Sequence, residues 1–293
     1  MTTADKPLIE QGWLRALLYI IVSMALVFIA LFGIGMVTAL TGSTQFIEAG
    51  EESIGRFLLT YSIMTLVMIG LALLFRKWAD RQPLVTMGFQ WKQYRGQAIA
   101  GFFLGILLIC IGTLALVAFK LLYFTSLEFD AGNFFSSLLL FVLVTFTEEI
   151  AFRGYILNNL MQSMNKWAAL ALSSVAFALF HATNPGAGLL PILNILVAGF
   201  LLGINYIFTK NLWFAIFLHF SWNFLQGPIM GYEVSGFAAP GLLQQTLKGS
   251  DLVTGGDFGF EGSVVCLFIN LAATILLGAW YAGYRSKPTP VEI

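Results

Sequence analysis

Charged residues are scarce in this 293-residue chain. Asp, Glu, Lys and Arg make up 10% of it, whereas about a quarter of a soluble domain is charged. Hydrophobic residues account for 58%. These proportions exclude an ordinary soluble domain and predict a lipid bilayer around most of the chain. With no basic stripe or nucleic-acid motif in the sequence, we expect no nucleic-acid partner.

Cysteine and histidine are also rare, which limits the chemistry that the chain can support. The two cysteines, Cys110 and Cys266, both lie in apolar runs, so neither a disulfide framework nor a cysteine zinc site is expected. The sequence contains no H-E-x-x-H, which argues against a zincin-like helix. All five aspartates lie outside the apolar runs, so a pair of membrane aspartates is not available either.

What the chain has in abundance is long apolar segments. Runs of 18 or more residues with few charges are typical of transmembrane helices. They predict an all-α polytopic bundle of about eight transmembrane helices that forms a single membrane domain, residues 1–293. The expected helices cover about 16–40, 57–75, 97–124, 134–160, 167–182, 189–209, 211–226 and 262–284. Those at 167–182 and 211–226 are short enough to lie partly within the bundle, and the Gly-rich segment 227–261 is expected as an external loop.

The distribution of Lys and Arg predicts the orientation, because cytoplasmic loops are enriched in these residues. Eight spans place 11 of the 15 basic residues on the side of the linker between the second and third helices. Arg56, Lys120 and Lys248 fall on the opposite side. We therefore expect a multi-pass protein of the bacterial plasma membrane with both termini in the cytoplasm.

Two pairs of glycines with GxxxG spacing, Gly101 with Gly105 and Gly199 with Gly203, lie inside expected helices. Small residues at this spacing let membrane helices approach closely. We interpret both pairs as helix-packing positions.

Five ionisable side chains remain inside the expected spans: Glu148, Glu149, Arg153, His181 and His219. Such residues are costly in a membrane and usually face a protein interior or a hydrated cavity. Glu149 and Arg153 are four residues apart, which predicts an ion pair on one helix face. Glu148 has no such partner and is suited to exchange protons with water.

The two histidines are the only ones in the chain, and each lies in an apolar segment. His219 and Asn223 share a helix face because they are four residues apart. From the rise of about 1.5 Å per residue, Glu148, His181 and His219 lie roughly 12–21 Å from the cytoplasmic helix ends and are able to meet. A carboxylate with one or two imidazoles can orient a water directly or bind Zn²⁺, and the sequence leaves both open. The Asn223 amide would then stabilise an oxyanion.

Three motifs on successive apolar segments give the chain a family resemblance. They are EExxxR at 148–153, FxxxH at 177–181 and HxxxN at 219–223. In these motifs the chain resembles the CAAX prenyl endopeptidases and bacteriocin-processing proteins, called the CPBP or Abi family, with residues 135–226 as the catalytic core. The resemblance implies that Glu148 is the general base, that His181 holds the attacking water and that His219 and Asn223 form the oxyanion site. Glu149 and Arg153 would support them, and a metal, if bound, would be held by Glu148, His181 and His219.

The sequence therefore predicts an intramembrane endopeptidase that cleaves a membrane-associated or lipidated peptide or protein. The main alternative is a non-catalytic membrane immunity or scaffold protein in which the polar cluster only locks helices together. A transporter or proton relay has less support, because transporters tend to show inverted repeats and none is found in this sequence.

Overall fold

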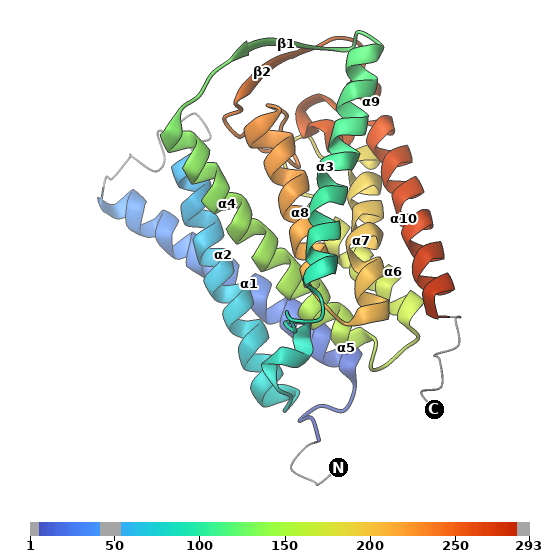
Figure 1. Ribbon diagram of the computed structural model, residues 1–293. Helices are drawn as coiled ribbons and strands as arrows, with labels where there is room; N and C mark the ends of the chain where they lie inside the picture. Colours follow the sequence, from blue (N-terminus) through green and yellow to red (C-terminus); the bar gives the residue numbers. More distant parts are fainter. Residues whose placement is uncertain (1–5, 42–53, 286–293) are drawn as a thin grey trace.

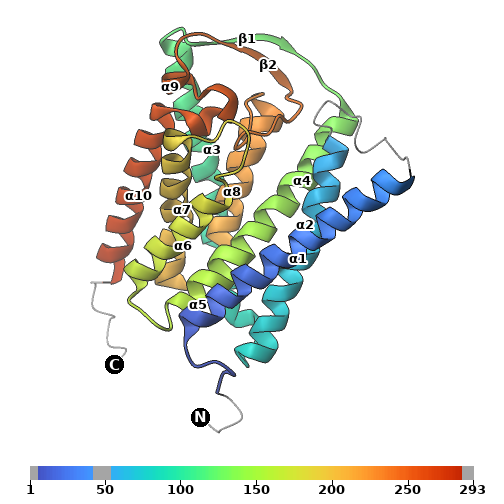
Figure 2. The same ribbon diagram turned by 180° about the vertical axis from the view of Figure 1, so that it is seen from behind.

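The computed structural model describes residues 6–41 and 54–285, and these residues form a bundle of helices (Figures 1 and 2). Six of the described helices are long and apolar enough to cross a membrane, and the expectation of an all-α polytopic membrane bundle is confirmed. The long helices are α1 (Gly12–Thr41), α2 (Ile54–Leu74), α3 (Arg95–Ala118), α4 (Ala131–Glu149), α7 (Leu189–Thr209) and α10 (Val264–Arg285). The shorter ones are α5 (Asn158–Leu160), α6 (Lys166–Phe180), α8 (Trp213–Phe224) and α9 (Asp251–Thr254).

Helix α4 continues beyond its regular part through a π-helical segment. The segment Ile150–Leu157 is π-helical and leads directly into α5. Residues 131–160 therefore form one continuous apolar helix. Shorter π-helical turns follow α2 at Phe75–Ala79 and α8 at Leu225–Ile229. Wide turns of this kind frequently occur at functional sites, and the longest of the three begins immediately after the two glutamates.

The third helix is shorter than the sequence predicts. We expected it to continue to residue 124, but α3 ends at Ala118, and Leu122–Leu127 form strand β1. Lys120 adopts a left-handed backbone conformation, with φ of 57°, which ends the helix. The aromatic and β-branched residues that follow favour a strand, and β1 pairs antiparallel with β2 (Leu243–Leu247).

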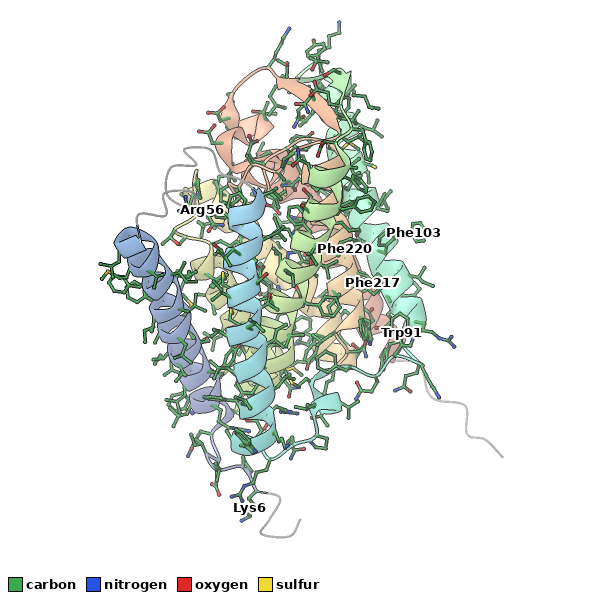
Figure 3. The ribbon with its side chains drawn as sticks, turned by 90° about the vertical axis from the view of Figure 1, so that its left-hand side faces the viewer. Lys6, Arg56, Trp91, Phe103, Phe217 and Phe220 are labelled. Atoms are coloured by element: carbon green, nitrogen blue, oxygen red, sulfur yellow. The ribbon has the colours of Figure 1, made fainter. Side chains whose placement is uncertain are left out.

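The two ends of the bundle differ in structure. Helix α1 begins and α10 ends at one end, whereas β1, β2 and α9 lie at the other (Figures 1 and 2). Figure 3 shows Lys6 and Arg56 at opposite ends, as their distribution in the sequence predicts. The Trp91 ring, labelled in the same view, lies 4.9 Å from that of Trp213 on α8.

A buried charge cluster connects α1 to the π-helical turn after α2 and to the π-helical segment Ile150–Leu157. The Asp80 carboxylate pairs with Arg15 and with Arg76, each at 2.9 Å. It also accepts hydrogen bonds from the Tyr155 hydroxyl at 3.1 Å and from Asn159 at 3.2 Å. Since Asp80 is fully buried, these four donors replace the water that a buried carboxylate would otherwise lack.

Both glycine pairs lie at close helix contacts, as predicted. A Cβ at Gly101 would overlap the backbone of Phe214, and one at Gly105 would overlap Ser221 and the Leu218 carbonyl, all on α8. On α7, Gly199 and Gly203 face Ser174 and Leu170 of α6 in the same way. The glycines therefore set how near α3 and α6 lie to their partner helices.

We predict that Gly105→Ala destabilises the protein by about 1–3 kcal/mol, the usual cost of overpacking. The measurement is the thermal unfolding temperature in detergent. Gly70→Ala on α2 is the matched control, because a Cβ there meets no atom within 4 Å. An unchanged unfolding temperature for Gly105→Ala would show that the α3–α8 contact tolerates a wider spacing.

The segment 227–261 folds over the end of the bundle that carries the strands, and contains β2, α9 and short 3₁₀ turns at Gly256–Phe258 and Phe260–Gly262. Within it, Glu233 is partly buried. Burial, together with the nearby charge of Asp257, raises the pKa of the Glu233 carboxyl above its ordinary value near 4.5. Ionising Glu233 therefore costs more in the folded protein than in the unfolded chain.

This shift predicts a pH-dependent effect of Glu233→Gln. Below about pH 4.5 the Glu233 carboxyl is neutral in both the folded and the unfolded state. As the pH rises, Glu233 ionises first in the unfolded chain, because its pKa is lower there. The wild type therefore loses stability until Glu233 also ionises in the folded protein. The variant avoids that loss. Its unfolding temperature should exceed that of the wild type at pH 7, and the difference should shrink at pH 4. Glu10→Gln, at an exposed position, is the control, and a difference that grows on acidification would contradict the prediction.

Candidate active site

Glu148 and Glu149 close the regular part of α4, immediately before the π-helical segment. Their side chains are 2% and 0% exposed. Two adjacent buried carboxylates in a membrane bundle need compensating donors. The described residues donate hydrogen bonds to Glu149 Oε1 but none to Glu148 Oε2.

Glu149 joins two helices through a single carboxylate oxygen. Its Oε1 lies 3.0 Å from the Arg153 guanidinium and accepts a hydrogen bond of 2.8 Å from His219 Nδ1 on α8. Arg153 also donates to the Gly199 carbonyl on α7 at 3.3 Å, and its guanidinium lies 4.4 Å above the Phe177 ring of α6. The predicted ion pair is present, but Glu149 also orients His219, a contact that the sequence did not indicate.

The His181 ring is held by its own helix. His181 Nδ1 lies 2.8 Å from the Phe177 carbonyl. Because a carbonyl oxygen only accepts, Nδ1 carries the proton and Nε2 of the neutral ring has a free lone pair. That Nε2 lies 3.8 Å from Glu148 Oε2.

Glu148 lies between the two histidines without touching either. Its Oε2 is 3.8 Å from His181 Nε2 and 3.9 Å from His219 Nε2, and it accepts no hydrogen bond from the described residues. The adjoining cavity of about 40 Å³ is lined by polar groups that include Tyr61, His181, His219 and Asn223. A water needs only about 10–15 Å³ and two to four polar partners, so the cavity can hold water at Glu148.

The Glu148 carboxylate and the two imidazoles are not arranged as a closed tetrahedral metal site in this structure. Zinc ligands lie about 2.0–2.2 Å from the ion, which places neighbouring ligand atoms about 3.3–3.6 Å apart. Glu148 Oε2 is farther than this from both imidazoles. Within residues 6–41 and 54–285, no group of three or more His, Cys, Asp or Glu side chains is arranged to hold a metal. The arrangement leaves room for a water instead.

The predicted convergence of Glu148, His181 and His219 is therefore present, and Asn223 lines the same cavity, 4% exposed. Sequence reasoning missed two further residues of the segment 227–261, Ser235 and Glu261, which line cavities that His181 and His219 also line. Neither belongs to a recognisable motif. Only the three-dimensional path of that segment brings them to the site.

Comparison with known proteins gives one match, in the part of the chain that carries these residues. Residues 130–225 match the family model described as type II CAAX prenyl endopeptidase Rce1-like. No curated protein and no solved structure shows significant similarity to the chain. The matched region contains all three motifs and extends from the start of α4 through α8. Residues 130–225 of this membrane bundle are therefore similar to the Rce1-like family, which is consistent with the CPBP family that the motifs resemble.

Proposed function

We propose that this protein is an intramembrane endopeptidase in which Glu148 activates a water molecule to cleave a peptide bond. The observation that supports the proposal most directly is the buried Glu148 Oε2, which faces two imidazole Nε2 atoms across a cavity of water size. A carboxylate and an imidazole that share one water are a common arrangement for general-base hydrolysis.

In the proposed reaction, water binds between Glu148 and His181. One O–H donates to Glu148 Oε2 and the other to the lone pair on His181 Nε2. Glu148 takes the proton as the water oxygen bonds to the carbonyl carbon of the substrate. It then returns this proton to the amide nitrogen as the C–N bond breaks, which frees Glu148 for another cycle.

The carbonyl oxygen becomes negative as the water adds, and His219 and Asn223 are the donors proposed for it. His219 already donates from Nδ1 to Glu149, so a donor at Nε2 requires the imidazolium. In that state Arg153 and His219 balance the charges of Glu148 and Glu149. The Asn223 amide adds a neutral donor, a type of contact whose removal costs about 10²–10³ in rate in other hydrolases.

The proposed substrate is a membrane-associated or lipidated peptide or protein, because the site is buried within an apolar bundle and the matched family acts on prenylated CAAX sequences. The proposed orientation puts both termini in the cytoplasm, with the strand-bearing end of the bundle outside.

The proposal predicts that Glu148→Ala and Glu148→Gln lower cleavage by about 10²- to 10⁴-fold, because neither side chain can take a proton from water. The measurement is quantitative proteomics of membrane and secreted peptides from cells that express the wild type or a variant. Peptides cleaved only by the wild type identify the substrate. Glu128→Ala, on the exposed segment before α4, is the matched control and should cleave like the wild type.

Folding and insertion of each variant are checked by its amount and unfolding temperature in the membrane fraction. Undiminished cleavage by well-folded Glu148→Ala would refute the role of Glu148. Identical peptide profiles of all variants and the wild type would instead favour a non-catalytic immunity or scaffold protein.

A second prediction concerns metal removal. Because no group of three or more His, Cys, Asp or Glu side chains in the described residues is arranged to hold a metal, we expect cleavage of the identified substrate to be unchanged after dialysis against EDTA or 1,10-phenanthroline. The rate is measured with purified protein before and after chelation. Loss of activity that added Zn²⁺ restores would contradict the water-only arrangement.

A further inference from the structure

The segment 232–239 forms a wall of the cavity beside Glu148. Val234, Ser235, Phe237, Ala238 and Ala239 all line this cavity. The segment lies outside the matched residues 130–225, so nothing in the family match accounts for it.

Backbone contacts fix this wall against its neighbours. Val234 bridges both Phe237 and Gly259, and Gly236 donates to the Phe258 carbonyl at 3.2 Å. Gly236 has a φ of 85°, and a Cβ on it would overlap the Pro185 carbonyl. The wall thus lies directly against the loop that follows His181.

The strongest polar contacts of the wall come from Glu261. One carboxylate oxygen accepts from both the Ser235 amide at 2.8 Å and the Ser235 hydroxyl at 2.7 Å. The other accepts from Trp222 Nε1 at 3.0 Å. The Ser235 carbonyl in turn accepts from Asn184 at 2.9 Å.

Burial makes these contacts strong. Glu261 is 7% exposed and Trp222 is 5% exposed, and hydrogen bonds to a charged group are roughly twice as strong as neutral ones. Trp222 directly precedes Asn223 on α8, so Glu261 connects the helix that carries His219 and Asn223 to the wall at Ser235.

Ser235 lies between two cavities. It lines the cavity beside Glu148 and also a second, largely apolar cavity of about 30 Å³, which His181 and His219 line as well. Glu261, Leu202 and Leu218 line the second cavity as well. A shift of Ser235 would change the shape of both spaces next to the scissile bond.

From these contacts we propose that Glu261 is a positioning residue. It holds the wall 232–239 at a distance from His219 and Asn223 that lets a substrate backbone fit between the wall and these two side chains. This inference rests on the proposed endopeptidase function. Glu261 itself does not touch the reacting atoms. It acts through Ser235 and Trp222.

The first test is hydrogen exchange of the purified full-length protein, read by mass spectrometry over residues 232–239. In Glu261→Gln an NH₂ group replaces one of the two carboxylate oxygens. One hydrogen-bond acceptor is therefore lost, either at Ser235 or at Trp222. The Ser235 amide should exchange about tenfold faster or more, which corresponds to 1.36 kcal/mol. Trp222→Phe, which keeps the carboxylate, should accelerate exchange less. Asp251→Asn, the same kind of change at an exposed acid of the segment 227–261 outside the wall, should leave Ser235 exchange unchanged.

The second test is kinetic and uses a fluorogenic farnesylated CAAX peptide. Glu261→Gln should raise KM about tenfold with little change in kcat, because it alters the fit of the substrate while Glu148, His181 and His219 stay in place. Asp251→Asn, at an exposed acid outside the wall, should match the wild type in both constants.

The two tests separate the positioning role from the proposed function. Hydrogen exchange does not require cleavage, so faster Ser235 exchange supports the contact even if the wild type cleaves no peptide, an outcome that would count against the endopeptidase itself. Unchanged Ser235 exchange in folded Glu261→Gln overturns the proposal. A fall in kcat with unchanged KM overturns it as well, because it would place Glu261 in the chemical step.

Discussion

The shared carboxylate oxygen of Glu149 is the contact on which the rest of the site depends. It holds Arg153 of its own helix and His219 of α8 at the same time, and Arg153 extends the connection to α7 and to the Phe177 ring of α6. Four helices are thus fixed relative to one buried charge. Because loss of one partner would leave an uncompensated charge in an apolar interior, these helices have little freedom to slide along one another.

The charges of this buried cluster balance when His219 is an imidazolium. The carboxylates of Glu148 and Glu149 are then matched by the Arg153 guanidinium and the His219 imidazolium. The Oε2 atoms of Glu148 and Glu149 both lack a hydrogen bond from the described residues, but Glu149 is held through its Oε1, whereas Glu148 lines the cavity. The other members are held by protein contacts, so the group proposed to exchange a proton is also the one left accessible to water.

Much of this was predictable from the sequence, for identifiable reasons. The long apolar runs predict the helices, because a helix must be long enough to cross a bilayer. The spacing of Gly101 and Gly105 predicts a close contact with a neighbouring helix. The three motifs identify the site, because ionisable residues are rare in these helices. The end of α3 was missed because its apolar run continues into β1, where a left-handed Lys120 redirects the chain. Glu261 was missed because nothing in a Gly-rich segment indicates which acid folds back among the helices, a property of tertiary packing alone.

The pairing of β1 with β2 has a consequence for the biogenesis of the protein. Strand β1 precedes the Rce1-like segment in the chain and β2 follows it, so the ribbon cannot form until α4 through α8 have been synthesised. The wall at Ser235 and its anchor at Glu261 lie on either side of β2 in sequence. A nascent chain therefore completes α4 through α8 and their buried charges first, and the cavity beside Glu148 receives its final wall only after Glu261 has been synthesised.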